Sequence, residues 1–472
     1  MDKHSSDTDE IVTDAPRGNR ALLSFGEQAD RRTLVRAVLQ LSLPAIGEQF
    51  VFGLIQLAML WMVGGLGPQA IAVVGLAGQI NWFLVSAFFA FGIGATALVA
   101  RAKGGTDEKL AVEATVQAVI ATTLAGLVLL VLGCSFSSEI LQFMGLSSSL
   151  AAMGTPYLRL LLISTLFMAD AACLSGALRG AGDTRTPLYI NAFRGVLNLG
   201  LAYWLIHGGL GIAPLGLIGA GIATVVSTLV ALLLFMVALQ SGKLLLYVRF
   251  RNRLYVNFPL IQRILNVGLP AGLEQLILSG GILVFARLVT SLGTDAYAAH
   301  QIAVNITNLC QPLAAGFAVA ASAFTGQVLG AHKATLAAKT TRIALVLSAS
   351  LQTLIALLFL LFAVPLVGLF TTDARVIALG ALALRWAALS QPGLGIYQVV
   401  AGSLRGAGDT RAPLLLTFIG LWALRLGIGT LAVKVFQMGL SGVWLGVVVD
   451  QWVRALLIWF RFRKNRWQQI EV

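Results

Sequence analysis

The chain has 472 residues, of which 58% are hydrophobic and only 11% are charged, and its formal net charge is +13. An ordinary soluble protein is about half apolar and about a quarter charged, so this composition excludes a soluble enzyme. It indicates a polytopic membrane protein, and the long apolar runs favour helices over a β-barrel, whose short strands would alternate.

Apolar runs of transmembrane length follow one another after a polar N-terminal segment. The first six spans are predicted at about 37–64, 70–100, 110–133, 153–178, 187–207 and 215–240. Six more are predicted at about 262–290, 296–328, 338–365, 376–404, 413–434 and 440–460. The predicted fold class is therefore an all-α membrane protein with twelve transmembrane helices.

The spans divide the chain into five segments. We expect an N-terminal tail, a first lobe, a linker between the lobes, a second lobe and a C-terminal tail, at 1–36, 37–240, 241–260, 261–460 and 461–472. Positive residues resist translocation, and 25 of the 33 Lys and Arg fall on one side of this arrangement. Both tails and the linker are therefore predicted to be cytosolic. The positive charge is explained by this topology and by contact with anionic membrane lipids, and not by nucleic acid.

The second half of the chain repeats the first at a constant offset in residue number. LRGAGDTRTP at 178–187 returns as LRGAGDTRAP at 404–413, and LPAIGEQ at 43–49 returns as LPAGLEQ at 269–275, so the repeat offset is 226. Near the ends of the two halves the repeat offset falls to 223, which pairs Gly216 with Gly439. Because each half has an even number of spans, the halves are parallel repeats. Two similar bundles that face each other are suited to alternating access.

The doubled LRGAGDTR phrase predicts a hairpin after the fourth span of each half. Its Gly-x-Gly pair permits a chain reversal, and Asp183 and Asp409, or the threonines after them, can cap the next helix. Arg179 and Arg405 then lie at helix C-termini, where the helix dipole favours a cation. We interpret the phrase mainly as a structural and topological signal, with a direct role in gating as the alternative.

Two glutamates occupy equivalent places in the first span of each half. Glu48 and Glu274 each follow a proline by four residues, and each lies about 15 to 17 Å along its span from the cytosolic edge. An uncompensated charge inside a membrane costs about 2.5 kcal/mol or more. Each glutamate is therefore interpreted as a carboxyl that alternates between a proton and a cationic cargo, or as a hydrogen-bonded acid between the lobes.

Two further acids lie inside the predicted spans. Asp170 corresponds to Ile396 in the repeat, so only the first half carries it. It is either an ion site or a packing group that is hydrogen-bonded to Ser175 or Thr165. Asp450 precedes Arg454 by one helical turn, and we expect the two to neutralise each other. The deep arginines Arg194 and Arg425 are both possible partners of an acid such as Asp170.

For a cargo we expect a central cleft between the lobes, with few polar groups on an apolar and aromatic wall. The candidate lining residues are Gln56, Gln79, Asn81, Trp61 and Trp82 in the first half and Gln301, Asn305, Asn308 and Phe317 in the second. Interhelical hydrogen bonds and lipid-facing rings are the alternatives for each. No metal-ligand spacing, His pair or Ser-Lys dyad is present in the sequence, so we predict no metal site, no cofactor and no enzymatic activity.

Taken together, the motifs resemble the MATE (multidrug and toxic compound extrusion) transporter family. The resemblance rests on the doubled LRGAGDTR and LPAxxEQ motifs and on MVGGLG at 62–67, AAHQI at 298–302 and GLSGVW at 439–444. It covers essentially the whole chain after the tail. It implies a V-shaped pair of six-helix lobes in the plasma membrane that exports amphipathic, often cationic, compounds in exchange for protons or sodium ions.

For such an exchange, the candidate ion-coupling residues are Glu274, Glu48 and Asp170, acids that lie inside the predicted spans. Within the family, a prokaryotic subgroup has an Asp five residues before the Gly of its MVG motif, where this chain has Met59. We therefore favour protons over sodium, and we expect a monomer. The alternative is a flippase for lipid-linked saccharides, which would need more deep cations than this chain has.

Overall fold

The computed structural model describes residues 30–64, 68–208, 213–248 and 255–470. The helices of the first half are α2 (Arg31–Gly64), α3 (Pro68–Gly104), α4 (Glu108–Ser135), the short α5 (Ser137–Phe143), α6 (Ser148–Gly180), α7 (Arg185–His207) and α8 (Gly216–Gln240). Those of the second half are α9 (Phe258–Thr290), α10 (Thr294–Gly330), α11 (Ala334–Gly368), α12 (Ala374–Gly406), α13 (Arg411–Phe418), the π-helical η2 (Ile419–Leu426), α14 (Gly427–Lys434), α15 (Gly439–Arg463) and the 3-10 turn η3 (Arg466–Gln469).

The predicted all-α fold of two six-helix repeats is confirmed. The segments α13, η2 and α14 continue one another as a single helix, so each half has six long helices. Ten helices in the described residues are long and apolar enough to cross a membrane. Several helices extend past the predicted spans; α2, for example, begins at Arg31 and α9 at Phe258. Hydropathy marks only the apolar part of a helix, whereas backbone hydrogen bonding continues into the polar residues at its ends.

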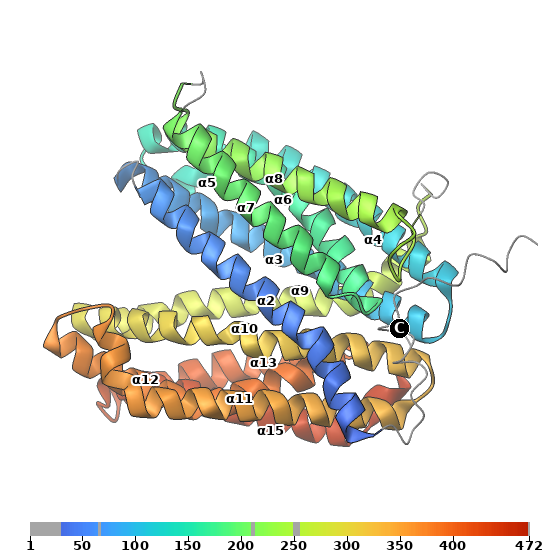
Figure 1. Cartoon of the computed structure of the whole chain (residues 1–472). Helices are drawn as coiled ribbons and strands as arrows, with labels where there is room; N and C mark the ends of the chain where they lie inside the picture. The colour runs from blue at the N-terminus through green and yellow to red at the C-terminus, as the bar shows by residue number, and fades with distance from the viewer. Residues whose placement is uncertain (1–29, 65–67, 209–212, 249–254, 471–472) are drawn as a thin grey trace, which may run out of the picture.

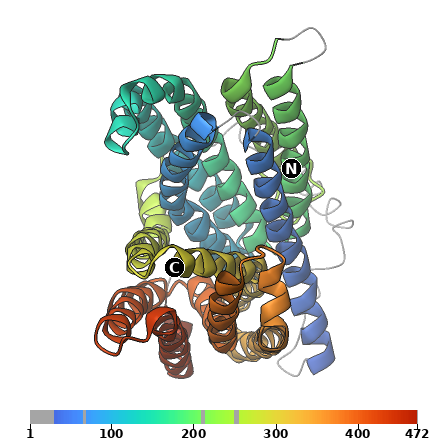
Figure 2. The ribbon, with the colours of Figure 1, turned by 90° about the vertical axis from the view of Figure 1, so that its left-hand side faces the viewer.

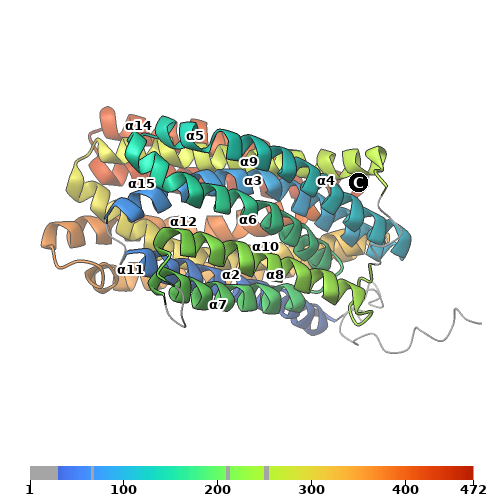
Figure 3. The same cartoon turned by 90° about the horizontal axis from the view of Figure 1, so that it is seen from above.

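The two halves form two lobes that meet at one end and diverge toward the other (Figure 1). We call the end at which α2 starts and α3, α6, α8, α10, α12 and α15 end the basic end. Seen from above, the long helices of both lobes run along one common direction (Figure 3). Figure 2 views the molecule from the side of the other end, with the helices of the first half above those of the second.

The first helix of each half contributes to the core of both lobes. The first turns of α2, including Leu34 and Val38, pack in one hydrophobic core with α10, α11, α12 and α15. In the same way, Ile264 and Val267 of α9 pack with α3, α4, α6 and α8. Figure 2 shows α2 running along one side of the molecule from the upper lobe to the lower. The predicted first lobe, 37–240, therefore gives the start of its first helix to the core of the second lobe.

Between the lobes, helices approach each other closely enough to bring backbone against backbone. A Cβ atom on Gly104 of α3 would lie 1.9 Å from the carbonyl oxygen of Gln327 on α10, and one on Gly268 of α9 would lie 1.9 Å from the carbonyl oxygen of Ala90 on α3. The Gln327 side chain also donates a hydrogen bond of 2.8 Å to the carbonyl oxygen of Gly180. Only glycine fits such contacts, so the small residues bring the lobes together toward the basic end.

Candidate ion-coupling site

Each glutamate of the LPAxxEQ motif forms an ion pair with the first arginine of the LRGAGDTR phrase in the same half. Arg179 Nη2 lies 2.6 Å from Glu48 Oε1, and Arg405 Nη2 lies 2.8 Å from Glu274 Oε2. The repeat offset of 226 relates both partners, so the repeat contains the same ion pair twice. In the sequence the two motifs were considered separately and this pairing was missed, although their common offset was a signal for it.

The ion pairs place both carboxyls near the hairpins at the basic end. Arg179 and Arg405 are the last residues but one of α6 and α12, at the basic end. Each glutamate must lie within the reach of one arginine side chain from that end.

A third side chain completes each pair, and it too follows the repeat. Asn191 Nδ2 donates to Glu48 Oε1 at 2.7 Å, and Thr417 Oγ1, its counterpart in the second half, donates to Glu274 Oε1 at 2.8 Å. Glu274 also accepts a hydrogen bond of 3.2 Å from the hydroxyl of Tyr397. Both carboxyls are thus compensated by a cation and by neutral donors.

The hairpins that carry the two arginines have the predicted geometry. Asp183 Oδ1 accepts hydrogen bonds of 3.0 Å from the first two amides of α7, and Asp409 Oδ1 accepts one of 3.3 Å near the start of α13. Gly182 and Gly408 have φ angles of 91° and 94°, which glycine adopts without strain. The aspartates, and not the threonines after them, therefore provide the capping side chains.

In the second half, Asp450 joins two arginines. Arg454 Nε lies 2.6 Å from Asp450 Oδ1, which confirms the predicted pair, and Arg425 Nη2 lies 2.6 Å from Oδ2. Arg425 therefore pairs with Asp450 and not with Asp170. The guanidinium of Arg454 also lies 4.7 Å from the ring centre of Tyr397, which connects this cluster to Glu274. Asp450 is fully buried.

Of the four acids Glu48, Asp170, Glu274 and Asp450, Asp170 has the fewest partners among the described residues. It is 5% exposed, and it lies in α6 about 15 Å, or ten residues, from the basic end of that helix. Its Oδ2 accepts a hydrogen bond of 2.9 Å from Thr123 of α4, while its Oδ1 has no hydrogen-bond partner. No Lys or Arg in the described residues forms an ion pair with it. Of the nearby hydroxyls, Thr165 bonds to Asn81 instead.

The candidate cargo residues fall into three groups. Five of them are exposed on two helices that contact each other across the lobes, α3 and α10: Gln79, Trp82, Gln301, Asn305 and Asn308. Two are already engaged, because Asn81 accepts a hydrogen bond from Thr165 and Phe317 is 4% exposed within the core around α2. The side chains of Gln56 and Trp61 lie outside the part of the chain that the structure describes.

Metal ligands do not gather in the described part of the chain. No group of three or more His, Cys, Asp or Glu side chains there is arranged to hold a metal ion. The three cysteines, Cys134, Cys173 and Cys310, are free thiols on separate helices.

Comparison with known proteins gives the same repeat and the same fold. The family MatE matches residues 44–204 and 270–431, once in each half. NorM of Thermotoga maritima, a probable multidrug resistance protein, is 31% identical over 92% of this chain and 93% of its own length. YoeA of Bacillus subtilis, also a probable multidrug resistance protein, is 26% identical over 84% of this chain and 86% of its own.

Solved structures of MATE proteins superpose on nearly the whole molecule. A MATE crystal structure in complex with MaL6 covers 97% of this chain and all of its own, with a TM-score of 0.87 and 24% identity. The Vibrio cholerae MATE transporter VcmN in its bent form covers 92% of this chain and 97% of its own, with a TM-score of 0.85 and 22% identity. With the doubled family match and two lobes of six helices, the chain belongs to the MatE family of multi-pass membrane transporters.

Proposed function

We propose that the protein is a proton-coupled antiporter that exports amphipathic, often cationic, compounds across the plasma membrane by alternating access. The observation that carries this proposal is Asp170, a buried carboxyl with one hydroxyl donor and no basic partner in the described residues. An acid of this kind inside a membrane protein is by default a candidate for a proton or ion site.

Proton binding at Asp170 compensates its charge without any other ligand. A sodium ion would need a shell of several oxygen atoms, as hard cations generally do, and the carboxylate has only the Thr123 hydroxyl bonded to it. In the proposed cycle, Asp170 takes up a proton while the lobes are open to the outside and releases it when they open to the cytosol. The two protonation states then favour different arrangements of the lobes.

Glu48 and Glu274 are proposed to couple this change to the movement of the lobes. Each ties the first helix of its half to the hairpin after the fourth, and that first helix also packs in the other lobe. A proton or a cationic cargo that competes with Arg179 or Arg405 would loosen this tie. Pro44 and Pro270 lie inside the same helices, one turn before the glutamates, and interrupt their hydrogen bonding.

The cargo is proposed to bind between α3 and α10. The exposed amides and the Trp82 ring on these helices supply hydrogen bonds and one aromatic face for an oily cation. Gln56 and Trp61 remain further candidates from the same reasoning, whereas Asn81 and Phe317 are engaged with Thr165 and with the core around α2. We propose that the basic end and both termini are cytosolic, in line with the distribution of Lys and Arg. We also propose that the transporter is monomeric.

The test is ethidium export from proteoliposomes with separately imposed gradients. A pH gradient should drive export by the wild-type protein, whereas a sodium gradient at constant pH should not. Asp170→Asn should reduce proton-driven export at least tenfold and leave the thermal unfolding of the purified protein nearly unchanged, because Asn can still bond to Thr123. Export driven by sodium alone would contradict proton coupling, and full proton-driven export by Asp170→Asn would exclude that residue.

Thr123 provides a matched pair of controls for the same assay. Thr123→Val removes the one hydrogen bond that the Asp170 side chain accepts within the described residues. It should lower proton-driven export about fivefold, the effect of one hydrogen bond worth about 1 kcal/mol. Thr123→Ser keeps the hydroxyl and should retain most of the export. If both substitutions reduced export equally, packing of the methyl group, and not the hydrogen bond, would explain the loss.

A further inference from the structure

Two pockets lie at the basic end, at equivalent places in the two halves. The first is a cavity of about 790 Å³ between the start of α2 and the start of α7. The second is a cavity of about 800 Å³ between α9, α13 and α15. Gln40 and Arg185 of the first correspond, at the repeat offset, to Asn266 and Arg411 of the second. The two pockets thus share one amide and one arginine position of the repeat, and their other cations come from different segments, α2 in the first and residues 461–466 in the second.

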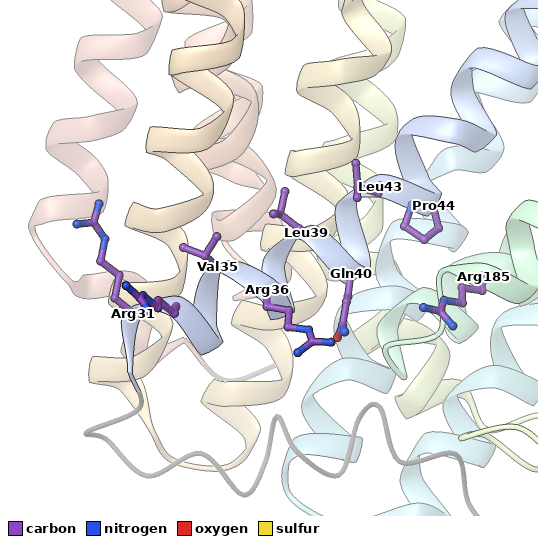
Figure 4. A pocket seen from close by; sticks show the side chains of 9 residues that line it. Arg31, Val35, Arg36, Leu39, Gln40, Leu43, Pro44 and Arg185 are labelled. Carbon is purple, nitrogen blue, oxygen red and sulfur yellow. The ribbon is translucent and has the colours of Figure 1, made fainter.

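The first pocket combines four arginines with an apolar wall. Its cations are Arg31, Arg32 and Arg36 of α2 and Arg185 of α7. All four are exposed, none forms an ion pair with a residue that the structure describes, and no acid lines the pocket. Figure 4 shows Arg36 and Gln40 side by side on α2, with Arg185 across the pocket on α7. The apolar side chains are Val35, Leu39, Leu43 and Pro44.

The second pocket also combines basic side chains with apolar ones. It is lined by Arg411, Arg461, Lys464 and Arg466, and its apolar side chains are Leu415, Leu416, Leu457 and Phe460. Its acid, Asp409, is bonded to Arg461 at 2.9 Å. Three cations are left that form no ion pair within the described residues.

The position of these pockets indicates what fills them. In the first, Leu43 lies twelve residues, or about 18 Å, along α2 from Arg31, so the apolar wall continues from the helix end toward the membrane interior. Guanidinium groups bind phosphate oxygens through paired hydrogen bonds, and basic side chains at a membrane surface attract anionic lipids. A free phosphate ion would use the cations but not the apolar wall. A phospholipid with an anionic head group would use both.

We propose that each pocket binds one anionic phospholipid, with its phosphate on the arginines and an acyl chain along the apolar wall. Both pockets lie where the lobes join, because the first turns of α2 and α9 pack in the core of the opposite lobe. The lining of each pocket comes from one half, so a bound lipid would contact the helix of that half that also packs in the opposite lobe. This inference does not depend on which residue carries the proton or on the nature of the cargo.

The test is native mass spectrometry of the delipidated full-length protein with added dioleoyl phosphatidylglycerol or dioleoyl phosphatidylcholine. The wild-type protein should retain two molecules of phosphatidylglycerol in preference to phosphatidylcholine. Arg36→Gln with Arg185→Gln should lose one of them, and Arg411→Gln with Lys464→Gln the other. Each affected site should bind about 30-fold more weakly, the loss expected for two basic side chains at a lipid surface.

The matched control removes two exposed basic residues of the same end outside both pockets, Lys109→Gln with Arg342→Gln, and should keep both lipids. Equal retention of the two lipids, or two tightly bound phosphatidylglycerol molecules in either pocket variant, would overturn the proposal. So would displacement of the lipid by millimolar inorganic phosphate, which would indicate a site for the free ion. If the first pocket bound phosphatidylglycerol only after removal of residues 1–28, the N-terminal tail and not a lipid would occupy it in the full-length protein, and the proposal would be overturned for that pocket. Because the substituted side chains are exposed, every variant should unfold at the wild-type temperature without lipid.

Discussion

The two lobes share a fold and one ion pair, but they differ in the rest of their polar core. Glu48 and Glu274 each bind an arginine from the hairpin of their own half. In the second half, Tyr397 extends this network toward Asp450 and its two arginines. The residue at the position of Tyr397 in the first half is Ala171, so the network ends there.

The first lobe has its own polar group at a place where the second has none. Asp170 bonds to Thr123, whereas its counterpart in the second lobe is Ile396. The ion pair and the hairpin are thus common to both repeats because the fold needs them to hold the first helix of each half. The other charges differ, so the second lobe contains a compensated network and the first an acid without a cation.

The largest expected difference between the lobes concerns Asp450. Asp450→Asn leaves two buried arginines, Arg425 and Arg454, without a carboxylate and should lower the free energy of unfolding by about 3–5 kcal/mol. In the first lobe the offset of 223 that holds near the ends of the halves places Ser227 at this position, and Ser227→Ala should cost about 1 kcal/mol. Denaturant unfolding in detergent micelles measures both. Similar losses would mean that Asp450 is compensated in some other way.

Double-mutant cycles on the shared ion pair should show an intermediate effect. The Glu274 side chain is 4% exposed and accepts from Tyr397, whereas that of Glu48 is 11% exposed. Unfolding of Glu274→Gln, Arg405→Gln and the double variant should give a coupling energy of about 2 kcal/mol. The cycle of Glu48→Gln and Arg179→Gln should give about 1 kcal/mol. If the coupling energy of Glu48 with Arg179 were as large as that of Glu274 with Arg405, neither the deeper burial of Glu274 nor its hydrogen bond from Tyr397 would strengthen the ion pair.

The smallest effects should be equal in the two lobes, because they concern the shared hairpin. Gly182→Ala and Gly408→Ala place a Cβ on residues with φ of 91° and 94° and should each cost about 1 kcal/mol of unfolding free energy. The same unfolding assay applies. Losses that differed by more than about 1 kcal/mol would show that the two hairpins are held differently by their surroundings.

Much of the fold could be predicted from local patterns, and the parts that could not be predicted depend on distant neighbours. The apolar runs gave the helices, and the Gly-x-Gly-Asp sequence gave the hairpins, because both depend on nearby residues. Hydropathy does not say which lobe a helix packs in, so the crossing of α2 and α9 was missed. For the same reason Phe317 was assigned to a cleft, although it packs against α2.

The sequence by itself determined that this is a twelve-helix membrane protein built from two parallel repeats, since both the apolar content and the repeat offset can be counted along the chain. It also indicated which acids lie in the membrane. Only the tertiary structure decided which of these acids are paired, because Glu48 and Arg179 are 131 residues apart and are brought together by packing. A charge inside a membrane needs a compensating partner in space. Of Glu48, Asp170, Glu274 and Asp450, only Asp170 forms no ion pair with a cation among the described residues.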